Sequence, residues 1–187
     1  MKQPATPLTA AQARRVYDGR LVKVDLNTVT TPDGSEMELE IIRHPGASAV
    51  VPLLSAPDSE DPSVLLIEQY RYATGGTIWE IPAGVLEPEE DPLDCAHREL
   101  LEETGASAGS MSHLITIYTT PGFTDERIHL FLATDISVGD TSHEADEFIE
   151  VTSRPLSRVL EMIRDGEIVD GKSIVALLYV AGFKLGL

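Results

Sequence analysis

Three glutamates lie close enough in the sequence to act on one ligand. Glu99 and Glu103 are four residues apart, and Glu102 comes three residues after Glu99. In an α-helix this spacing places all three on neighbouring positions of one face. Carboxylates so close repel one another unless water solvates them or a hard cation such as Mg²⁺ takes their oxygens as ligands. The spacing is therefore compatible with a solvated acidic face or with a magnesium site.

A helix with clear ends would carry these glutamates. Asp91 is a good N-cap residue, Pro92 suits the first helical position, and Gly105 can end a helix. These signals predict a helix over 92–104. Its other face carries apolar residues such as Ala96 and Leu100, which we expect to pack on a sheet.

This helix belongs to a longer segment, 84–106, with the sequence GVLEPEEDPLDCAHRELLEETGA. The segment resembles the signature of the Nudix hydrolase family at Gly84, Glu90, Arg98, Glu99, Leu100, Glu102, Glu103 and Gly105. At Ala106 the family usually has a larger aliphatic residue, and we expect this departure to affect packing more than chemistry. The resemblance implies an α+β fold, the Nudix α/β/α sandwich with a mixed central sheet, over 46–187. A small antiparallel β-module over 1–45 would precede it.

The resemblance also implies a metal site in this signature segment. It makes Glu99 and Glu103 the main ligands, joined by the backbone carbonyl of Ala83, with Glu102 as a weaker candidate. About two or three Mg²⁺ ions, with Mn²⁺ as the alternative, would neutralise the phosphates of a substrate and activate a water molecule.

Other charged residues receive roles from the same resemblance. Glu90 and Arg98 would form a structural ion pair that braces the loop against the helix. A general base would come from a later loop, where we favour Glu147, also a candidate metal ligand, because it directly precedes the strand-like segment 148–151. Glu144 stays an alternative, and both could instead be solvated surface acids.

A proline fifteen residues beyond the signature segment, Pro121, resembles the marker of the ADP-ribose pyrophosphatases. Pro121 and Gly122 give a rigid turn that a ligand can approach closely, although the pair alone could form any β-turn. Arg71 resembles the arginine that contacts a substrate phosphate in this branch, with a surface salt bridge as the alternative. The remaining predicted substrate contacts are Arg43, Leu86 and Glu126.

Two features bear on the choice of substrate. In some relatives aromatic side chains of the N-terminal module sandwich the adenine, but the aligned positions here hold Leu21 and Leu39. The stretch 160–172 resembles relatives that hydrolyse GDP-mannose. We therefore rank ADP-ribose first as the substrate, and GDP-mannose or another nucleoside diphosphate sugar second.

Short apolar or alternating segments predict the strands that would position these residues. They lie at 21–24, 37–42, 48–54, 64–71, 78–81, 113–118, 128–133 and 147–151, with a turn predicted at 82–84. Two closing helices are predicted at 156–164 and from about residue 172. The module over 1–45 is too small to bury a core of its own, and in the branch that this chain resembles it forms the interface of a domain-swapped homodimer. We therefore expect a homodimer.

The composition bears on which partners and which cellular compartment we expect. A formal net charge of −17 repels phosphate backbones and disfavours binding of nucleic acid. The single cysteine, Cys95, excludes an intramolecular disulfide and suits a reducing cytosol, so we expect a cytoplasmic protein. The N-terminus has no apolar signal region, and the apolar run over 174–187 is short and interrupted by Lys184, so no membrane role is expected.

Three rival functions stay open beside the hydrolase. The first is a non-catalytic Nudix domain that senses a nucleotide sugar, which the intact glutamates disfavour. The second is a Nudix enzyme of another substrate class, which Pro121 and the N-terminal module disfavour. The third is a purely structural acidic domain.

Overall fold

The computed structural model describes residues 12–20, 22–56, 59–139 and 149–187. The chain forms two compact units. The first comprises residues up to His44 together with Thr120–Glu126, and the second comprises Pro45–Thr119 and Arg127–Leu187. The order and bounds of the elements are β1 (Gln12–Asp18), β2 (Lys23–Thr30), β3 (Glu36–Arg43), β4 (Ala47–Pro52), β5 (Ser63–Arg71), η1 (Tyr72–Thr74), β6 (Gly76–Glu80), β7 (Ala83–Val85), α1 (Pro92–Thr104), β8 (Ala106–Tyr118), β9 (Arg127–Val138), β10 (Ile149–Pro155), α2 (Leu156–Arg164), α3 (Gly171–Tyr179) and η2 (Val180–Leu185).

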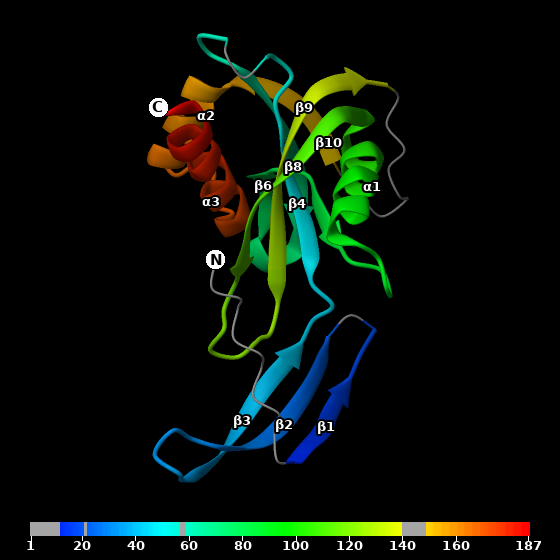
Figure 1. Cartoon of the computed structure of the whole chain (residues 1–187), viewed down its shortest axis with the longest axis vertical. Helices are drawn as coiled ribbons and strands as arrows, with labels where there is room; N and C mark the ends of the chain where they lie inside the picture. Colours follow the sequence, from blue (N-terminus) through cyan, green and yellow to red (C-terminus); the bar gives the residue numbers. More distant parts are fainter. Residues whose placement is uncertain (1–11, 21, 57–58, 140–148) are drawn as a thin grey trace. The chain divides into compact units, whose positions relative to one another are not determined.

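The first unit is an antiparallel sheet in the order β1-β2-β3, drawn in blue in Figure 1. β2 and β3 extend the strands predicted around 21–24 and 37–42, and Gly34 makes the turn between them with a φ of +87°, a conformation that favours glycine. The loop Thr120–Glu126 is attached to β3, since the Ile42 N–H donates to the Phe123 carbonyl at 2.8 Å. Residues far apart in the sequence thus meet in this unit.

The second unit contains two sheets with helices on both sides. One sheet has the order β7-β4-β9-β8, in which β4 and β9 are parallel and the other pairs antiparallel, and the second has the order β10-β5-β6. Figure 1 shows α1 on one side of this arrangement and α2 and α3 on the other. The predicted mixed α+β sandwich is therefore confirmed.

Two hydrophobic clusters join these layers. On the α1 side, Ala96 and Leu100 of the helix pack with Val50, Leu65 and Phe131 of the strands. The larger cluster, on the other side, joins the strands to α2 and α3 through the buried residues Leu66, Leu130, Leu156, Val159 and Leu177. Burial of these apolar side chains on both faces of the sheets is the main force that fixes α1 beside β4 and β7.

The ends of α1 agree with the sequence prediction. The Asp91 side chain accepts a hydrogen bond from the Leu93 N–H at 2.8 Å, and Gly105 ends the helix with a φ of +67°. The helix predicted over 92–104 is therefore confirmed. It could be predicted because the residues that cap its ends are local in the sequence.

Other local predictions were wrong. Residues 83–85 form the short strand β7 instead of continuing a turn, with Ala83 opposite Ala49 of β4. β8 starts at Ala106, directly after α1, rather than at residue 113. Its first half is rich in small and polar residues, so its pairing with β9 is not visible as an apolar pattern.

Among the helices of the described ranges, none combines the length and the apolar character needed to cross a bilayer.

Candidate active site

Two glutamates of α1 lie against the short strand β7. Glu103 is 2% exposed, and its Oε2 accepts a hydrogen bond from the Ala83 N–H at 2.8 Å. Glu99 is 8% exposed and lies directly over Gly84, where a Cβ atom would be 1.8 Å from Oε1 of Glu99. The glycine of the signature segment is therefore required for this close approach. The carboxylates of Glu99 and Glu103 thus lie against two consecutive residues of β7.

Arg98 binds three glutamates of the signature segment. Its Nη1 donates to Glu99 Oε1 at 2.6 Å and to Glu102 Oε2 at 3.0 Å. Its Nε and Nη2 donate to the two carboxylate oxygens of Glu90 at 2.8 and 3.0 Å, and Nη2 also reaches the Val85 carbonyl at 3.2 Å. The expected Glu90–Arg98 pair is present, and the same guanidinium offsets the repulsion between the α1 glutamates.

The Glu90–Arg98 pair predicts a pH-dependent contribution to stability. The hydrogen bonds from Arg98 lower the pKa of Glu90 from 4.5 to about 2. A carboxyl group whose pKa is lower in the folded chain stabilises the fold above its unfolded pKa, and this stabilisation is lost as the pH falls through the folded pKa. We expect Glu90→Gln to lower the free energy of unfolding at neutral pH, and the difference from wild type to shrink between about pH 5 and about pH 2.

Urea unfolding followed by circular dichroism, with EDTA present, checks this expectation at several pH values. A difference between the two proteins that stays constant over this range would show that Glu90 acts by packing rather than by charge.

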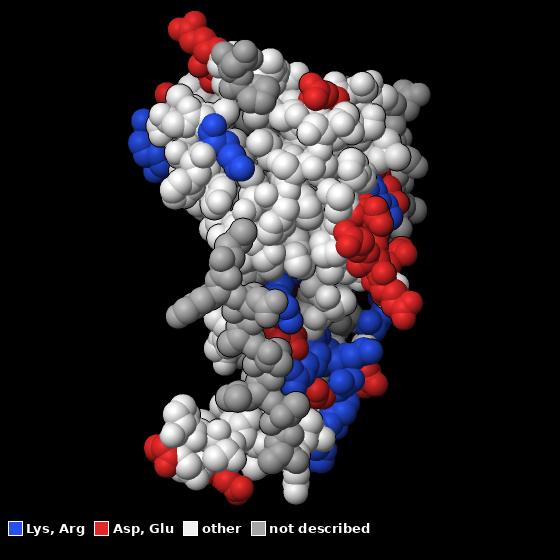
Figure 2. All heavy atoms as spheres, in the orientation of Figure 1, with Lys and Arg blue, Asp and Glu red and all other residues white. Residues whose placement is uncertain are grey.

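The donor set of the site fits a hard divalent cation. Glu99, Glu102, Glu103 and the Ala83 carbonyl offer only oxygen atoms, which are the ligands that Mg²⁺ and Mn²⁺ take in proteins. Figure 2 shows acidic side chains gathered over α1 and the loop before it. In the part of the chain that the structure describes, no three side chains of histidine, cysteine or acid already surround a single metal position. Glu99 and Glu102 each form an ion pair with Arg98, so a bound metal would compete with Arg98 for these carboxylates.

A second group of charges joins β5, β6 and α3. Arg71 Nε and Nη2 donate to the two carboxylate oxygens of Glu80 at 2.7 and 2.9 Å, and Lys172 Nζ also donates to Glu80. Burial of Glu80 acts to raise its pKa, but hydrogen bonds and charge from Arg71 and Lys172 outweigh burial and hold the pKa below its ordinary value. The Glu80 carboxylate is thus charged, and at 2% exposure it is buried.

Of the α1 carboxylates, Glu103 lies near enough to Arg71 for its charge to act on the guanidinium. The pKa of Arg71 is raised, first by its hydrogen bonds to Glu80 and to a smaller extent by the charges of Glu103 and Asp170. Its side chain is 41% exposed. Arg71 therefore forms a salt bridge with a buried carboxylate and not with a surface one, and its own side chain stays accessible.

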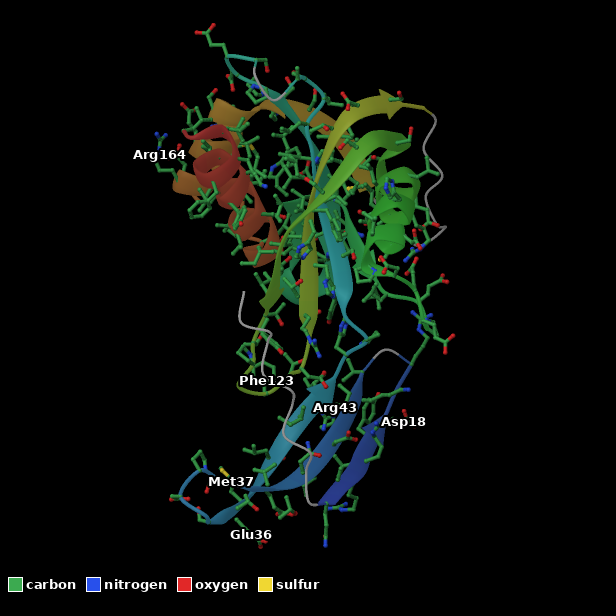
Figure 3. The ribbon with its side chains drawn as sticks, in the orientation of Figure 1. Asp18, Glu36, Met37, Arg43, Phe123 and Arg164 are labelled. Atoms are coloured by element: carbon green, nitrogen blue, oxygen red, sulfur yellow. The ribbon has the colours of Figure 1, made fainter. Side chains whose placement is uncertain are left out.

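Arg43 and Glu126 lie in the first unit. Arg43 contacts Asp25 at 2.9 Å, Asp125 at 3.0 Å and Asn27 at 3.3 Å, and Figure 3 shows it on β3. The carboxylate of Glu126 lies 3.5 Å from His44 Nδ1. The predicted substrate contacts Pro121 and Gly122 are exposed residues of the same loop.

The other predicted site residues are placed as follows. Leu86 follows β7 and donates its N–H to the Gly46 carbonyl at 3.1 Å. Leu39 is half-buried on β3. Leu21, Glu144 and Glu147 lie outside the described residues.

Cys95 is a structural residue of α1. It is fully buried, and burial raises the pKa of its thiol to about 11. Because the thiolate is the reactive form, we expect Cys95 to resist alkylation by iodoacetamide at pH 8 in the folded chain and to react at least about 100-fold faster in urea. Mass spectrometry of timed samples measures both rates. Equal rates would show that α1 opens readily.

Several neighbouring residues were not identified from the sequence. Asp170 and Lys172, both partly buried, form an ion-pair network with the buried Glu80, although Glu80 and Lys172 are 92 residues apart. On β5, Oε1 of the buried Gln69 has no hydrogen-bond partner among the described residues. The sequence indicated only that a helix starts near Lys172, and gave no sign that this lysine pairs with Glu80.

The chain is similar in sequence to known proteins. The family model of the NUDIX domain matches residues 44–174. The chain is 37% identical over 171 residues to the methanol dehydrogenase activator of Bacillus methanolicus, with 90% of each chain covered. It is 36% identical over 168 residues to the ADP-ribose pyrophosphatase of Bacillus subtilis (strain 168), with 89% of this chain and 88% of the relative covered.

One further relative and one solved structure are also similar to this chain. The GDP-mannose pyrophosphatase of Shigella flexneri is 37% identical over 166 residues, with 80% of this chain and 84% of the relative covered. A solved structure described as an ADP compounds hydrolase superposes with a TM-score of 0.79 at 21% identity, covering 95% of this chain and 94% of that chain, and shows the same fold. From its signature segment, its fold and these relatives, the chain belongs to the Nudix hydrolase family.

Proposed function

We propose that this protein hydrolyses the pyrophosphate bond of a nucleoside diphosphate sugar, with ADP-ribose as the first candidate and AMP and ribose 5-phosphate as its products. The observation that carries the proposal is the pair of carboxylates, Glu99 and Glu103, held against Gly84 and Ala83. Relatives named ADP-ribose pyrophosphatase and GDP-mannose pyrophosphatase support this substrate class.

The chemistry depends on a divalent metal, as is general in this family. We propose Mg²⁺, with Mn²⁺ as the alternative and about two or three ions per site, held by Glu99, Glu103 and the Ala83 carbonyl, with Glu102 contributing less. When bound, the metal would neutralise phosphate charge and lower the pKa of the attacking water. Arg98 would stay bound to Glu90 while Glu99 and Glu102 turn to the metal.

The remaining roles concern the proton and the substrate. A carboxylate, Glu147 or alternatively Glu144, would accept the proton from the water. The guanidinium of Arg71 would bind a phosphate oxygen. Contacts of Arg43, Leu86, Pro121, Gly122 and Glu126 with the substrate stay predictions that rest on the family resemblance.

The substrate order can be tested with one panel. ADP-ribose, GDP-mannose, UDP-glucose and a dinucleotide would be incubated with Mg²⁺, and phosphate release from the products would be coupled to a phosphatase. We expect the highest kcat/KM for ADP-ribose. A higher value for GDP-mannose would reverse our order and would agree with the stretch 160–172.

A regulatory role is the second candidate, because one relative is named an activator of another enzyme. In that case the chain would bind a nucleotide sugar without turning it over. All three carboxylates of the signature segment, Glu99, Glu102 and Glu103, are present, and this disfavours a purely regulatory role. Binding without hydrolysis across the whole panel would place regulation first.

We also propose that the chain forms a homodimer through its first unit and acts in the cytoplasm. Side chains of its sheet stay exposed, including Val16 at 48%, Tyr17 at 58% and Met37 at 45%. Such a small sheet gains stability by covering these apolar side chains. Light scattering at micromolar concentration should give the dimer mass, and a stable monomer would remove this proposal.

A further inference from the structure

We propose that Lys172 and Asp170, at the start of α3, are positioning residues that act through Glu80 to orient Arg71 toward a substrate phosphate. This inference rests on the proposed function, because it needs Arg71 to bind the phosphate. Nothing in the sequence signature assigns a role to these residues.

The contacts form a closed network. Arg71 binds Glu80 through two parallel hydrogen bonds, and Lys172 joins Glu80 to Asp170, which it contacts at 3.0 Å. Asp170 Oδ2 accepts from the N–H and the hydroxyl of Ser173 at 3.0 and 2.6 Å, and Ser173 Oγ accepts from the Ile81 N–H at 2.9 Å. Since Ile81 directly follows Glu80, α3 fixes both the side chain and the backbone at the end of β6.

Burial within the network decreases from Glu80 toward Arg71. The side chains of Glu80, Lys172 and Asp170 are 2%, 12% and 18% exposed, whereas that of Arg71 is 41% exposed. Two cations and two carboxylates balance, so the network adds no net charge. Apolar side chains can stabilise a buried site as well as a buried ion pair does. The charges are therefore better explained by the orientation that they give to Arg71 than by stability.

The orientation of the Arg71 guanidinium decides which of its N–H groups can bind a phosphate. A guanidinium has five N–H donors in one plane. Glu80 takes donors on the edge formed by Nε and Nη2, and for Nη1 the described residues offer no hydrogen-bond partner. An arginine fixed along one edge presents its other edge in a defined direction, which suits bidentate binding of a phosphate. If Lys172 were removed, Glu80 would lose one of its two cations and could turn with Arg71.

Two other roles for Lys172 make different predictions. A purely structural lysine would change stability without changing the affinity for the substrate. A lysine that itself contacts the substrate would act independently of Arg71. The variants Lys172→Met, Lys172→Arg, Arg71→Met and the double variant Lys172→Met/Arg71→Met separate these cases. Lys184→Met is the matched control, because Lys184 is an exposed lysine near the end of the chain.

Kinetics with ADP-ribose and Mg²⁺ test the inference. We expect Lys172→Met to raise KM about tenfold with kcat within about threefold of wild type, because binding of the phosphate is lost in both the ground state and the transition state. Lys172→Arg should recover most of the affinity, and Lys172→Met should add less than about twofold in the Arg71→Met background. Lys184→Met should behave as wild type.

Other results would overturn the inference in recognisable ways. A lower Tm with unchanged KM would make Lys172 structural, and effects that multiply in the double variant would make it a direct substrate contact. If wild type turns over no nucleotide sugar, the proposed function fails, and the test then uses Kd values for ADP-ribose measured by calorimetry. Kd values that change among the variants as expected for KM would support positioning. Any other pattern of Kd values, or no binding by wild type, would reject it.

Discussion

Replacing Glu103 by glutamine should lower kcat/KM for ADP-ribose by about a thousandfold, equivalent to about 4 kcal/mol of transition-state stabilisation. Glutamine has nearly the same shape, so its side-chain oxygen can still accept the hydrogen bond from Ala83. The substitution removes the negative charge that a divalent cation needs, at a position that is only 2% exposed. The fold should therefore survive while the metal-dependent chemistry fails.

Kinetics and thermal unfolding of the same preparation measure this prediction. Glu161→Gln is the matched control, because Glu161 is a half-exposed acid of α2 in a weaker ion pair, 3.5 Å from Arg158, and we expect its activity to stay within about twofold of wild type. If Glu103→Gln kept full activity at wild-type metal concentration, Glu103 would not be a metal ligand.

Replacing Gly84 by alanine should have an effect of similar size through a different cause. The new Cβ would lie 1.8 Å from Oε1 and 1.9 Å from Cδ of Glu99, so the carboxylate must leave its position. Its movement would also break the 2.6 Å contact with Arg98. We expect kcat/KM to fall at least about 100-fold, or about 3 kcal/mol, although the residue changed has no functional group.

Gly182→Ala is the control for this substitution. Gly182 lies in the C-terminal helical segment, and nothing is within 4 Å of its would-be Cβ, so alanine should leave activity unchanged and slightly favour the helix. The position of Glu99 in Gly84→Ala can be followed in a crystal structure. Full activity in Gly84→Ala would mean that catalysis does not require the Glu99 carboxylate to lie against residue 84.

The parts of the site that depend on local residue types could be predicted from the sequence. Asp91, Pro92 and Gly105 determine where α1 begins and ends, and the spacing of Glu99 and Glu103 then places both side chains on one face. The Glu90–Arg98 pair followed from the family signature and is present in the structure. Capping and helical spacing act over a few residues, and this makes them visible in the sequence.

The parts that depend on contacts between distant segments could not be predicted. β7 contains a glycine and follows a proline, and both residue types disfavour strands, so only its pairing with β4 reveals it. The network at Glu80 joins residues on β5, β6 and α3, and no local pattern marks it. The general base stays a prediction, because Glu144 and Glu147 lie outside the described residues.

The most direct test of the account is to identify the products formed from ADP-ribose by wild-type protein, with Mg²⁺ and with EDTA, in water enriched in oxygen-18. Mass spectrometry should find AMP and ribose 5-phosphate, one of them carrying the heavy oxygen, only when the metal is present. Cleavage elsewhere in the molecule, or an equal rate with EDTA, would contradict the metal-dependent pyrophosphate hydrolysis that we propose.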